Sequence, residues 1–168
     1  MQNLALVVFP GLMAFAIFSD LLTLTIPNLV SLILAVSYLA FSAWLGTPWA
    51  LVAMHVACGL VVLAITFILF EMRYIGGGDA KLASATALWL GIENLLEYLL
   101  VFSIIGGAVA LSIMTIRWYD HADRASSYRL LARVADKASN HMPYGVALGT
   151  AGVLLYPYST IWRGLAGL

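Results

Sequence analysis

The sequence from residue 61 to residue 90 reads VVLAITFILFEMRYIGGGDAKLASATALWL. Two apolar runs, 61–70 and 82–90, flank a polar turn that contains Gly76, Gly77, Gly78, Asp79 and Lys81. A charged side chain at the centre of a membrane helix costs about 2.5–3.5 kcal/mol on insertion scales, so an acid beside an apolar run needs a reason. Glycine lets the backbone turn and lets another chain approach closely. We therefore expect a functional turn between two membrane spans.

The composition is that of a membrane protein. The chain has 168 residues, of which 63% are hydrophobic and 10% are charged, whereas a soluble domain carries about 25% charged residues. The formal net charge is zero, which argues against nucleic acid as a partner, because phosphate binding needs a basic excess. The single cysteine, Cys58, permits neither an intrachain disulfide nor a multi-thiolate zinc site. We expect one membrane-embedded domain over residues 1–168.

The apolar runs predict an all-α, polytopic fold. A membrane-spanning helix needs about 20 mostly apolar residues. This criterion predicts spans at about 2–19, 28–46, 50–70, 82–92, 95–116 and 143–163. The fourth run is short and ends at the polar residues Glu93, Asn94 and Glu97, so six spans are favoured and five remain open if the fourth is re-entrant. The tryptophans near the span ends, Trp44, Trp49, Trp89, Trp118 and Trp162, suggest an interfacial aromatic belt.

The basic residues predict the orientation, because Lys and Arg are enriched on the cytoplasmic side. With six spans and the amino terminus outside, seven basic residues lie in the cytoplasm: Arg73, Lys81, Arg117, Arg124, Arg129, Arg133 and Lys137. Only Arg163 then lies outside, and Asp20 and Asp79 lie at the cytoplasmic face. Within 117–142, Arg129, Arg133 and Lys137 recur at every fourth position, which favours an amphipathic helix on the inner leaflet over a solvated loop.

Asp20 and Asp79 end two different predicted spans on the same side of the membrane. Two neighbouring carboxylates do not readily ionise together, so they share a proton and their pKa values separate. The ionised acid can take a proton from water, and the protonated acid can donate to a carbonyl oxygen or leaving amine. Hydrolysis of a peptide bond by this route needs no metal, cofactor or covalent intermediate. On periodicity alone, the simpler interpretation that each acid only marks a helix end is the favoured one.

The other polar residues have simpler interpretations. The triple glycine fits a tight turn, or a backbone against which an extended substrate lies, and it lacks the spacing of a nucleotide loop. Lys81 fits a side chain that snorkels to the membrane surface, with a modest electrostatic effect on Asp79. His55 and Cys58 share a helix face, but two ligands do not make a metal site. We expect His55 to be a packed interior residue.

Three motifs together resemble the type IV prepilin peptidases, the GxGD-type aspartic proteases of membranes. The motifs are Asp20 followed by Ile26-Pro27-Asn28, then 76–81 (GGGDAK), then 143–147 (PYGVA) at the start of the last span. They occur in the order of the family and cover nearly the whole chain. The size is similar to that of the short form found in tight-adherence (Flp) pilus systems.

The resemblance implies that Asp20 and Asp79 are the catalytic aspartates and that Gly76, Gly77, Gly78 and Lys81 complete the motif around the second. It implies substrates with a basic leader and an apolar helix, the prepilins and pseudopilins, cut at the cytoplasmic face of the bacterial inner membrane. The paired cysteines of the methylating members are absent, so we expect no methyltransferase domain. The alternatives are a small transporter that uses the two acids for ions or protons, and a non-catalytic pilus or secretion assembly subunit.

Overall fold

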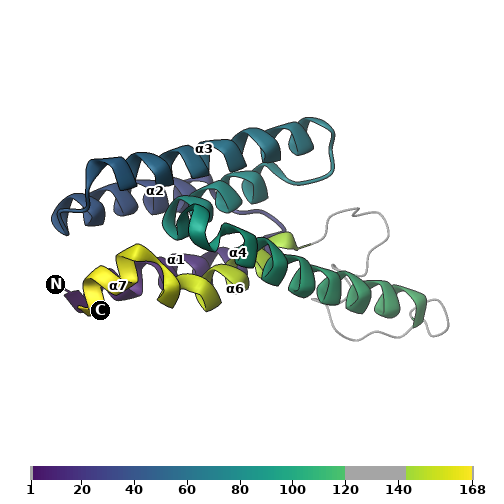
Figure 1. Ribbon diagram of the computed structural model, residues 1–168. Coiled ribbons are helices and arrows are strands. Elements are labelled where there is room, and N and C mark those ends of the chain that lie inside the picture. Colours follow the sequence, from purple (N-terminus) through teal and green to yellow (C-terminus); the bar gives the residue numbers. More distant parts are fainter. Residues whose placement is uncertain (1, 120–142, 168) are drawn as a thin grey trace.

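The computed structural model describes residues 2–119 and 143–167, and all regular elements in these residues are helices. Their order along the chain is α1 (Gln2–Thr23), α2 (Asn28–Trp44), α3 (Trp49–Glu71), α4 (Gly77–Tyr119), α6 (Tyr144–Leu155), the short 3₁₀ helix η1 (Tyr156–Tyr158) and α7 (Thr160–Ala166) (Figure 1). The predicted all-α class is therefore confirmed for the described residues. The surface helix predicted within 117–142 lies, from residue 120 onward, outside them.

Three helices in the described part of the chain are long and apolar enough to cross a membrane. They cover Leu6–Thr23, Trp49–Glu71 and Gly77–Thr115, while α2 is apolar but shorter, with 17 residues. The predicted count of six spans is not confirmed by these lengths. The last predicted span, 143–163, is divided among α6, η1 and α7, because Pro157 lies in η1 and the chain is extended at Ser159.

Helix α4 consists of two helical segments, 77–90 and 92–119, that meet at Gly91. Gly91 has φ 71° and ψ 177°, a backbone conformation that is strained for residues with a side chain. The Asn94 side-chain amide donates to the carbonyl of Leu90 at 2.9 Å, which satisfies an acceptor at the break. The sequence predicted a break at Glu93 and Asn94, but both residues are helical. Figure 1 shows that the second segment runs in a different direction from the first.

Helix α1 is longer than predicted and ends at Thr23 instead of residue 19. Asp20 therefore lies in the last turn of this helix and not in the following loop. The helix ends because Leu24 adopts a positive φ of 53°. Pro27 is the extended N-cap of α2, with φ −61° and ψ 134°.

Helix α6 packs against both α1 and α4. The reason is its run of small buried residues: Gly145, Ala147, Gly149, Ala151 and Gly152. A Cβ at Gly149 would lie 2.6 Å from Cγ1 of Ile17 in α1, and a Cβ at Gly152 would lie 3.2 Å from Cγ2 of Thr86 in α4. Small residues allow such close approach between membrane helices.

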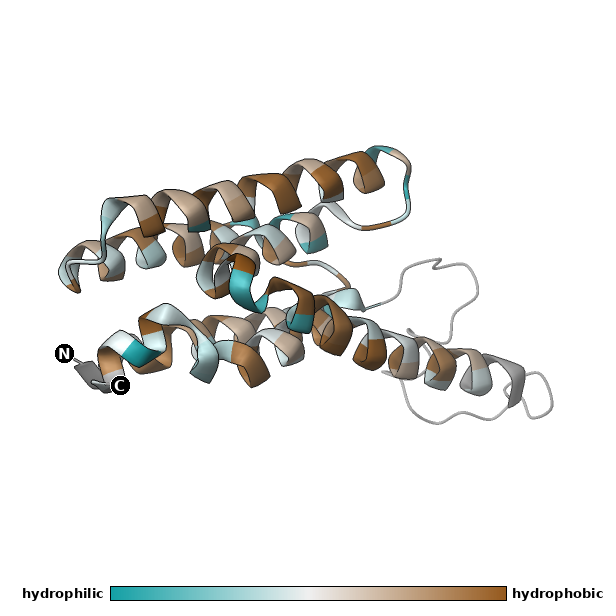
Figure 2. Cartoon of the chain, viewed as in Figure 1, coloured by the Kyte–Doolittle hydropathy of each residue, from teal (hydrophilic) through white to brown (hydrophobic). Residues whose placement is uncertain are grey.

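An aromatic cluster surrounds Trp89 in α4. Trp89 is fully buried, its ring contacts those of Phe9, Tyr38 and Tyr156, and its Nε1 donates to the carbonyl of Leu34 at 2.8 Å. The prediction that Trp89 belongs to an interfacial belt is therefore wrong, although Trp44 and Trp49 are exposed. Large apolar side chains also cover the outer surface of α3, as expected for a surface in contact with lipid (Figure 2).

Candidate active site

Asp20 is held between α1 and the start of α6. Its side chain is 4% exposed, and its Oδ2 accepts a hydrogen bond of 2.7 Å from the backbone N–H of Gly145. Gly145 is the second residue of α6, and the first N–H groups of a helix have no partner within that helix. The Asp20 carboxylate therefore also stabilises the amino-terminal end of α6, which carries a partial positive charge.

Asp79 is half-buried in the first turn of α4. Its Oδ2 accepts a hydrogen bond of 3.3 Å from the backbone N–H of Gly76, the residue directly before the helix. This contact is one half of a capping box, in which an acid in the first turn reaches back to the preceding backbone. A Cβ at Gly76 would lie 2.8 Å from Asp79 Oδ2, so a side chain at this position would crowd the carboxylate.

Ile26 lies close to residues that adjoin each of the two acids. A Cβ at Gly78, next to Asp79, would lie 3.1 Å from both Cβ and the carbonyl oxygen of Ile26. A Cβ at Gly145, next to Asp20, would lie 2.8 Å from Cδ1 of the same residue. The extended segment after α1 therefore contacts both acidic sites, and it does so because glycine leaves room on either side.

The structure places both acids next to residues that contact Ile26, Asp20 through Gly145 and Asp79 through Gly78. No hydrogen bond joins the two carboxylates in the described residues, where each accepts a backbone N–H instead. The two acids come from helices that are far apart in the sequence, and a water molecule or a peptide carbonyl placed between them could exchange protons with both. In residues 2–119 and 143–167, no group of three or more His, Cys, Asp or Glu side chains is arranged to hold a metal.

Lys81 does not contact either acid. Its Nζ donates to Oδ1 of Asn28 at 2.8 Å, which joins the start of α4 to the start of α2. Gly77 faces the ring of Phe70, where an added Cβ would lie 3.2 Å from Cε2. Of the residues predicted around Asp79, only Gly76 and Gly78 therefore border the space near the acids.

Sequence reasoning missed two parts of this arrangement. Gly145 was noted only as part of a motif, yet a Cβ there would lie 2.7 Å from Asp20 Oδ2, so its missing side chain gives that carboxylate its backbone donor. Asn28 was noted only for its position after Pro27, yet it is the hydrogen-bond partner of Lys81. The available signal was the small residue directly after Pro143 and Tyr144 at a helix start. His55, as expected, is a buried interior residue, 3% exposed.

A profile of the type IV leader peptidase family matches residues 7–111, which include both aspartates and the glycine turn. The chain belongs to the type IV leader peptidase family. Membership makes it a protease of the prepilin peptidase type, and its apolar helices make it an integral membrane protein. No curated protein and no solved structure matches the chain. The third motif, at 143–147, lies outside the matched range, although in the structure it adjoins the first aspartate through Gly145.

Proposed function

We propose that this family member is a membrane aspartyl endopeptidase that removes the leader from type IV prepilins and pseudopilins of the Flp type. Asp20 and Asp79 are its catalytic residues. The observation that carries the proposal is the convergence of two carboxylates, the buried Asp20 from α1 and the half-buried Asp79 from α4, on the same segment around Ile26. Enclosing two acidic side chains from separate helices in a membrane protein costs free energy, and ionisable residues within membrane segments generally belong to functional sites.

In the proposed mechanism, the two acids carry one proton between them. The ionised carboxylate accepts a proton from a water molecule as that water attacks the scissile carbonyl carbon. The protonated carboxyl group donates to the carbonyl oxygen, which gives a tetrahedral intermediate with two hydroxyl groups. As the C–N bond breaks, the proton gained from water passes to the leaving amine, and one hydroxyl of the intermediate returns a proton to the second carboxylate. The charge on the pair is the same before and after the reaction. Gly76 keeps a side chain away from the Asp79 carboxylate, beside which an extended substrate backbone lies, and Gly78 makes room for Ile26.

We further propose six membrane crossings with the acids at the cytoplasmic face of the bacterial inner membrane. The two segments of α4 would be the fourth and fifth crossings, and α6, η1 and α7 together the sixth. The distribution of charge supports this orientation, because Arg73 and Lys81 flank Asp79 whereas Arg163, in α7, lies at the opposite end of the molecule (Figure 1). Basic residues are retained on the cytoplasmic side, where the basic leader of the substrate would also lie.

The test is cleavage of a candidate prepilin by the purified protein in detergent, followed by mass measurement of the product. Asp20→Asn and Asp79→Asn are the informative variants, because the amide oxygen can still accept the hydrogen bond from Gly145 or Gly76. Each is expected to lose the acid–base contribution to the rate, about 10²–10⁴-fold. Glu97→Gln, at an exposed position of α4, is the matched control and is expected to retain full activity.

Full cleavage by either aspartate variant would contradict the two-acid mechanism. An intact prepilin with wild-type protein, together with aspartate-dependent proton or cation flux into liposomes, would instead favour the transporter. Binding of prepilin without cleavage or flux would favour the assembly subunit.

A further inference from the structure

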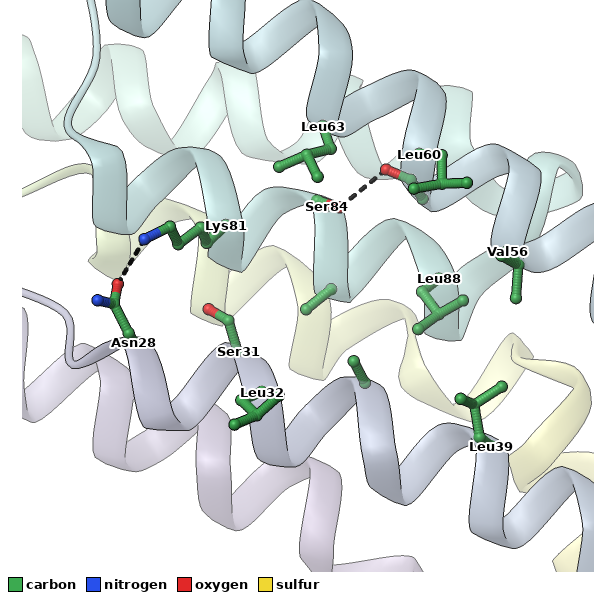
Figure 3. Close-up of a pocket in the computed structure, with 13 residues that line it drawn as sticks. Asn28, Ser31, Leu32, Leu39, Val56, Leu60, Leu63, Lys81, Ser84 and Leu88 are labelled. Carbon is green, nitrogen blue, oxygen red and sulfur yellow. Dashed lines mark hydrogen bonds between the residues drawn. The ribbon is translucent and has the colours of Figure 1, made fainter.

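A groove with a volume of about 410 Å³ lies on the outer side of the bundle, bounded by α2, α3 and α4 (Figure 3). Helix α4 forms its floor through Lys81, Ser84, Ala85 and Leu88, which recur at the spacing of one helix face. Asp79 is two residues from Lys81 and therefore projects from nearly the opposite face of α4. The groove is thus separate from the space that contains the two acids.

The chemical groups along the groove change in a fixed order. At one end, Lys81 Nζ and Asn28 Oδ1 form a hydrogen bond, and no carboxylate of the described residues pairs with the Lys81 charge. One turn further along α2 lies Ser31, and beyond it the walls are apolar, through residues such as Leu39 and Leu63. A cation, a hydroxyl group and an apolar channel therefore follow one another in the direction of the bilayer centre.

Ser31 has an unsatisfied hydroxyl group. Its side chain is 8% exposed, and its Oγ has no hydrogen-bond partner among residues 2–119 and 143–167. Other helical hydroxyl groups in the chain, such as those of Ser103 and Ser112, donate to the carbonyl of the preceding turn. An unpaired hydroxyl in an enclosed site is unfavourable, so the position of Ser31 in the groove lining indicates that the occupant carries an acceptor at this depth.

The groove has the dimensions of one hydrocarbon chain in one leaflet. From Asn28 to Leu39 the α2 wall rises roughly 16 Å, compared with about 15 Å for half of the hydrocarbon core. The groove therefore matches the length of one acyl chain within one leaflet.

From these observations, we propose that the groove binds one anionic phospholipid. Its phosphate lies beside Lys81, an ester carbonyl accepts the hydrogen bond of Ser31, and one acyl chain follows the apolar channel. Basic sites between membrane helices bind anionic headgroups in the same way. This lipid site goes beyond the proposed peptidase activity and does not depend on it.

The test is native mass spectrometry of the purified protein titrated with palmitoyl-oleoyl phosphatidylglycerol or phosphatidylcholine. The wild-type protein is expected to retain one phosphatidylglycerol with about fivefold preference over phosphatidylcholine, the contribution of one basic residue. Lys81→Gln is expected to abolish the preference. Ala35→Phe, which fills the groove, is expected to abolish retention of both lipids, whereas Ala40→Phe, at an exposed position outside the groove lining, retains them.

A second comparison isolates Ser31. An ether-linked phosphatidylglycerol lacks the carbonyl acceptor, so the wild-type protein should bind the ester form about fivefold more tightly, the effect of one hydrogen bond. Ser31→Ala should bind the two forms equally, and inorganic phosphate should displace neither. Equal retention of both headgroups by the wild-type protein, or no loss in Ala35→Phe, would overturn the proposal. Should Ala35→Phe slow prepilin cleavage with unchanged lipid binding, the groove accepts a substrate helix instead, and the lipid site is wrong.

Discussion

The two acids have unequal surroundings, and the difference is visible in their individual contacts. Asp20 is almost fully enclosed and contacts the start of α6 through Gly145, far away in the sequence. Asp79 is half-buried and contacts Gly76 within its own helix start. Loss of the first contact therefore affects the packing of two helices, whereas loss of the second affects only one turn.

The substitution Gly145→Ala tests the first of these contacts. The added methyl carbon would lie 2.7 Å from Oδ2 and 2.9 Å from Cβ of Asp20, so we expect a loss of about 1–3 kcal/mol in stability, as for other overpacked sites. Thermal unfolding in detergent measures this loss, and cleavage is expected to fall with it. Gly107→Ala, where no atom lies within 4 Å of the added carbon, should leave both unchanged. Equal stability of the two variants would show that α6 is not held against Asp20.

At the scale of helices, the break in α4 depends on one glycine and one histidine. A Cβ at Gly91 would lie 2.6 Å from the ring of His55, and that ring is fixed by a 2.9 Å hydrogen bond between Nδ1 and the carbonyl of Leu88. His55 also stacks on Tyr38, with 5.5 Å between the ring centroids. Helix α3 therefore contacts α4 at the residue where α4 changes direction.

We expect Gly91→Ala to destabilise the protein more than Gly46→Ala. Both positions have a positive φ, which costs about 1–2 kcal/mol for a residue with a side chain. Only at Gly91 would the added Cβ also collide with another residue, because nothing lies within 4 Å of a Cβ at Gly46. Chemical or thermal unfolding of both variants gives the difference, and His55→Ala in the Gly91→Ala background should recover part of it. An additive double variant would mean that the histidine does not limit the space at the break.

The existence of the helices was predictable from the sequence, but their ends were not. Apolar runs of sufficient length predict α1, α2 and α3, because burial in lipid requires them. The extension of α1 to Thr23, which places Asp20 in the helix, depends on the positive φ at Leu24. The break at Gly91 depends on space next to His55, a residue of another helix. Such tertiary contacts carry no local sequence signal.

The candidate site was predictable only in part, because some of its contacts are also tertiary. The cost of an acid beside a span singles out Asp20 and Asp79 without any structure. The contact of Gly145 with Asp20 joins residues at opposite ends of the chain, and no periodicity indicates such a pair. The burial of Trp89 was not predictable either. Its apolar run is followed by polar residues, and the same pattern is typical of a tryptophan at the membrane interface.

At the scale of the whole molecule, the end of α1 and the start of α4, which carry the acids, lie at one end of the bundle, and the start of α1 and α7 lie at the other (Figure 1). The turn after α3, with the exposed Tyr74, is at the acidic end, and the first residue of α3, the exposed Trp49, is at the opposite end. The two ends of α3 should therefore face different aqueous compartments.

Cysteine labelling tests this arrangement in membranes. In a Cys58→Ala background, we expect Tyr74→Cys to react with a membrane-impermeant maleimide only from the cytoplasmic side, and Trp49→Cys only from the outer side. Inverted and right-side-out vesicles give access to the two sides, and the wild-type protein, whose single cysteine is the buried Cys58, serves as the unreactive control. Labelling of both positions from one side would contradict the proposed crossing of α3.

Helix α6 has a further consequence, because it is a shared neighbour of α1 and α4 and consists largely of small residues. The distance between the two acids therefore depends on α6, whose spacing from its two neighbouring helices can be increased by adding one methyl group at a time. Alanine at Gly149 would push on α1, and alanine at Gly152 would push on α4, through Ile17 and Thr86 respectively. A graded set of such variants offers a way to measure how steeply the hydrolysis rate falls as the acids are moved apart, with both acids still present.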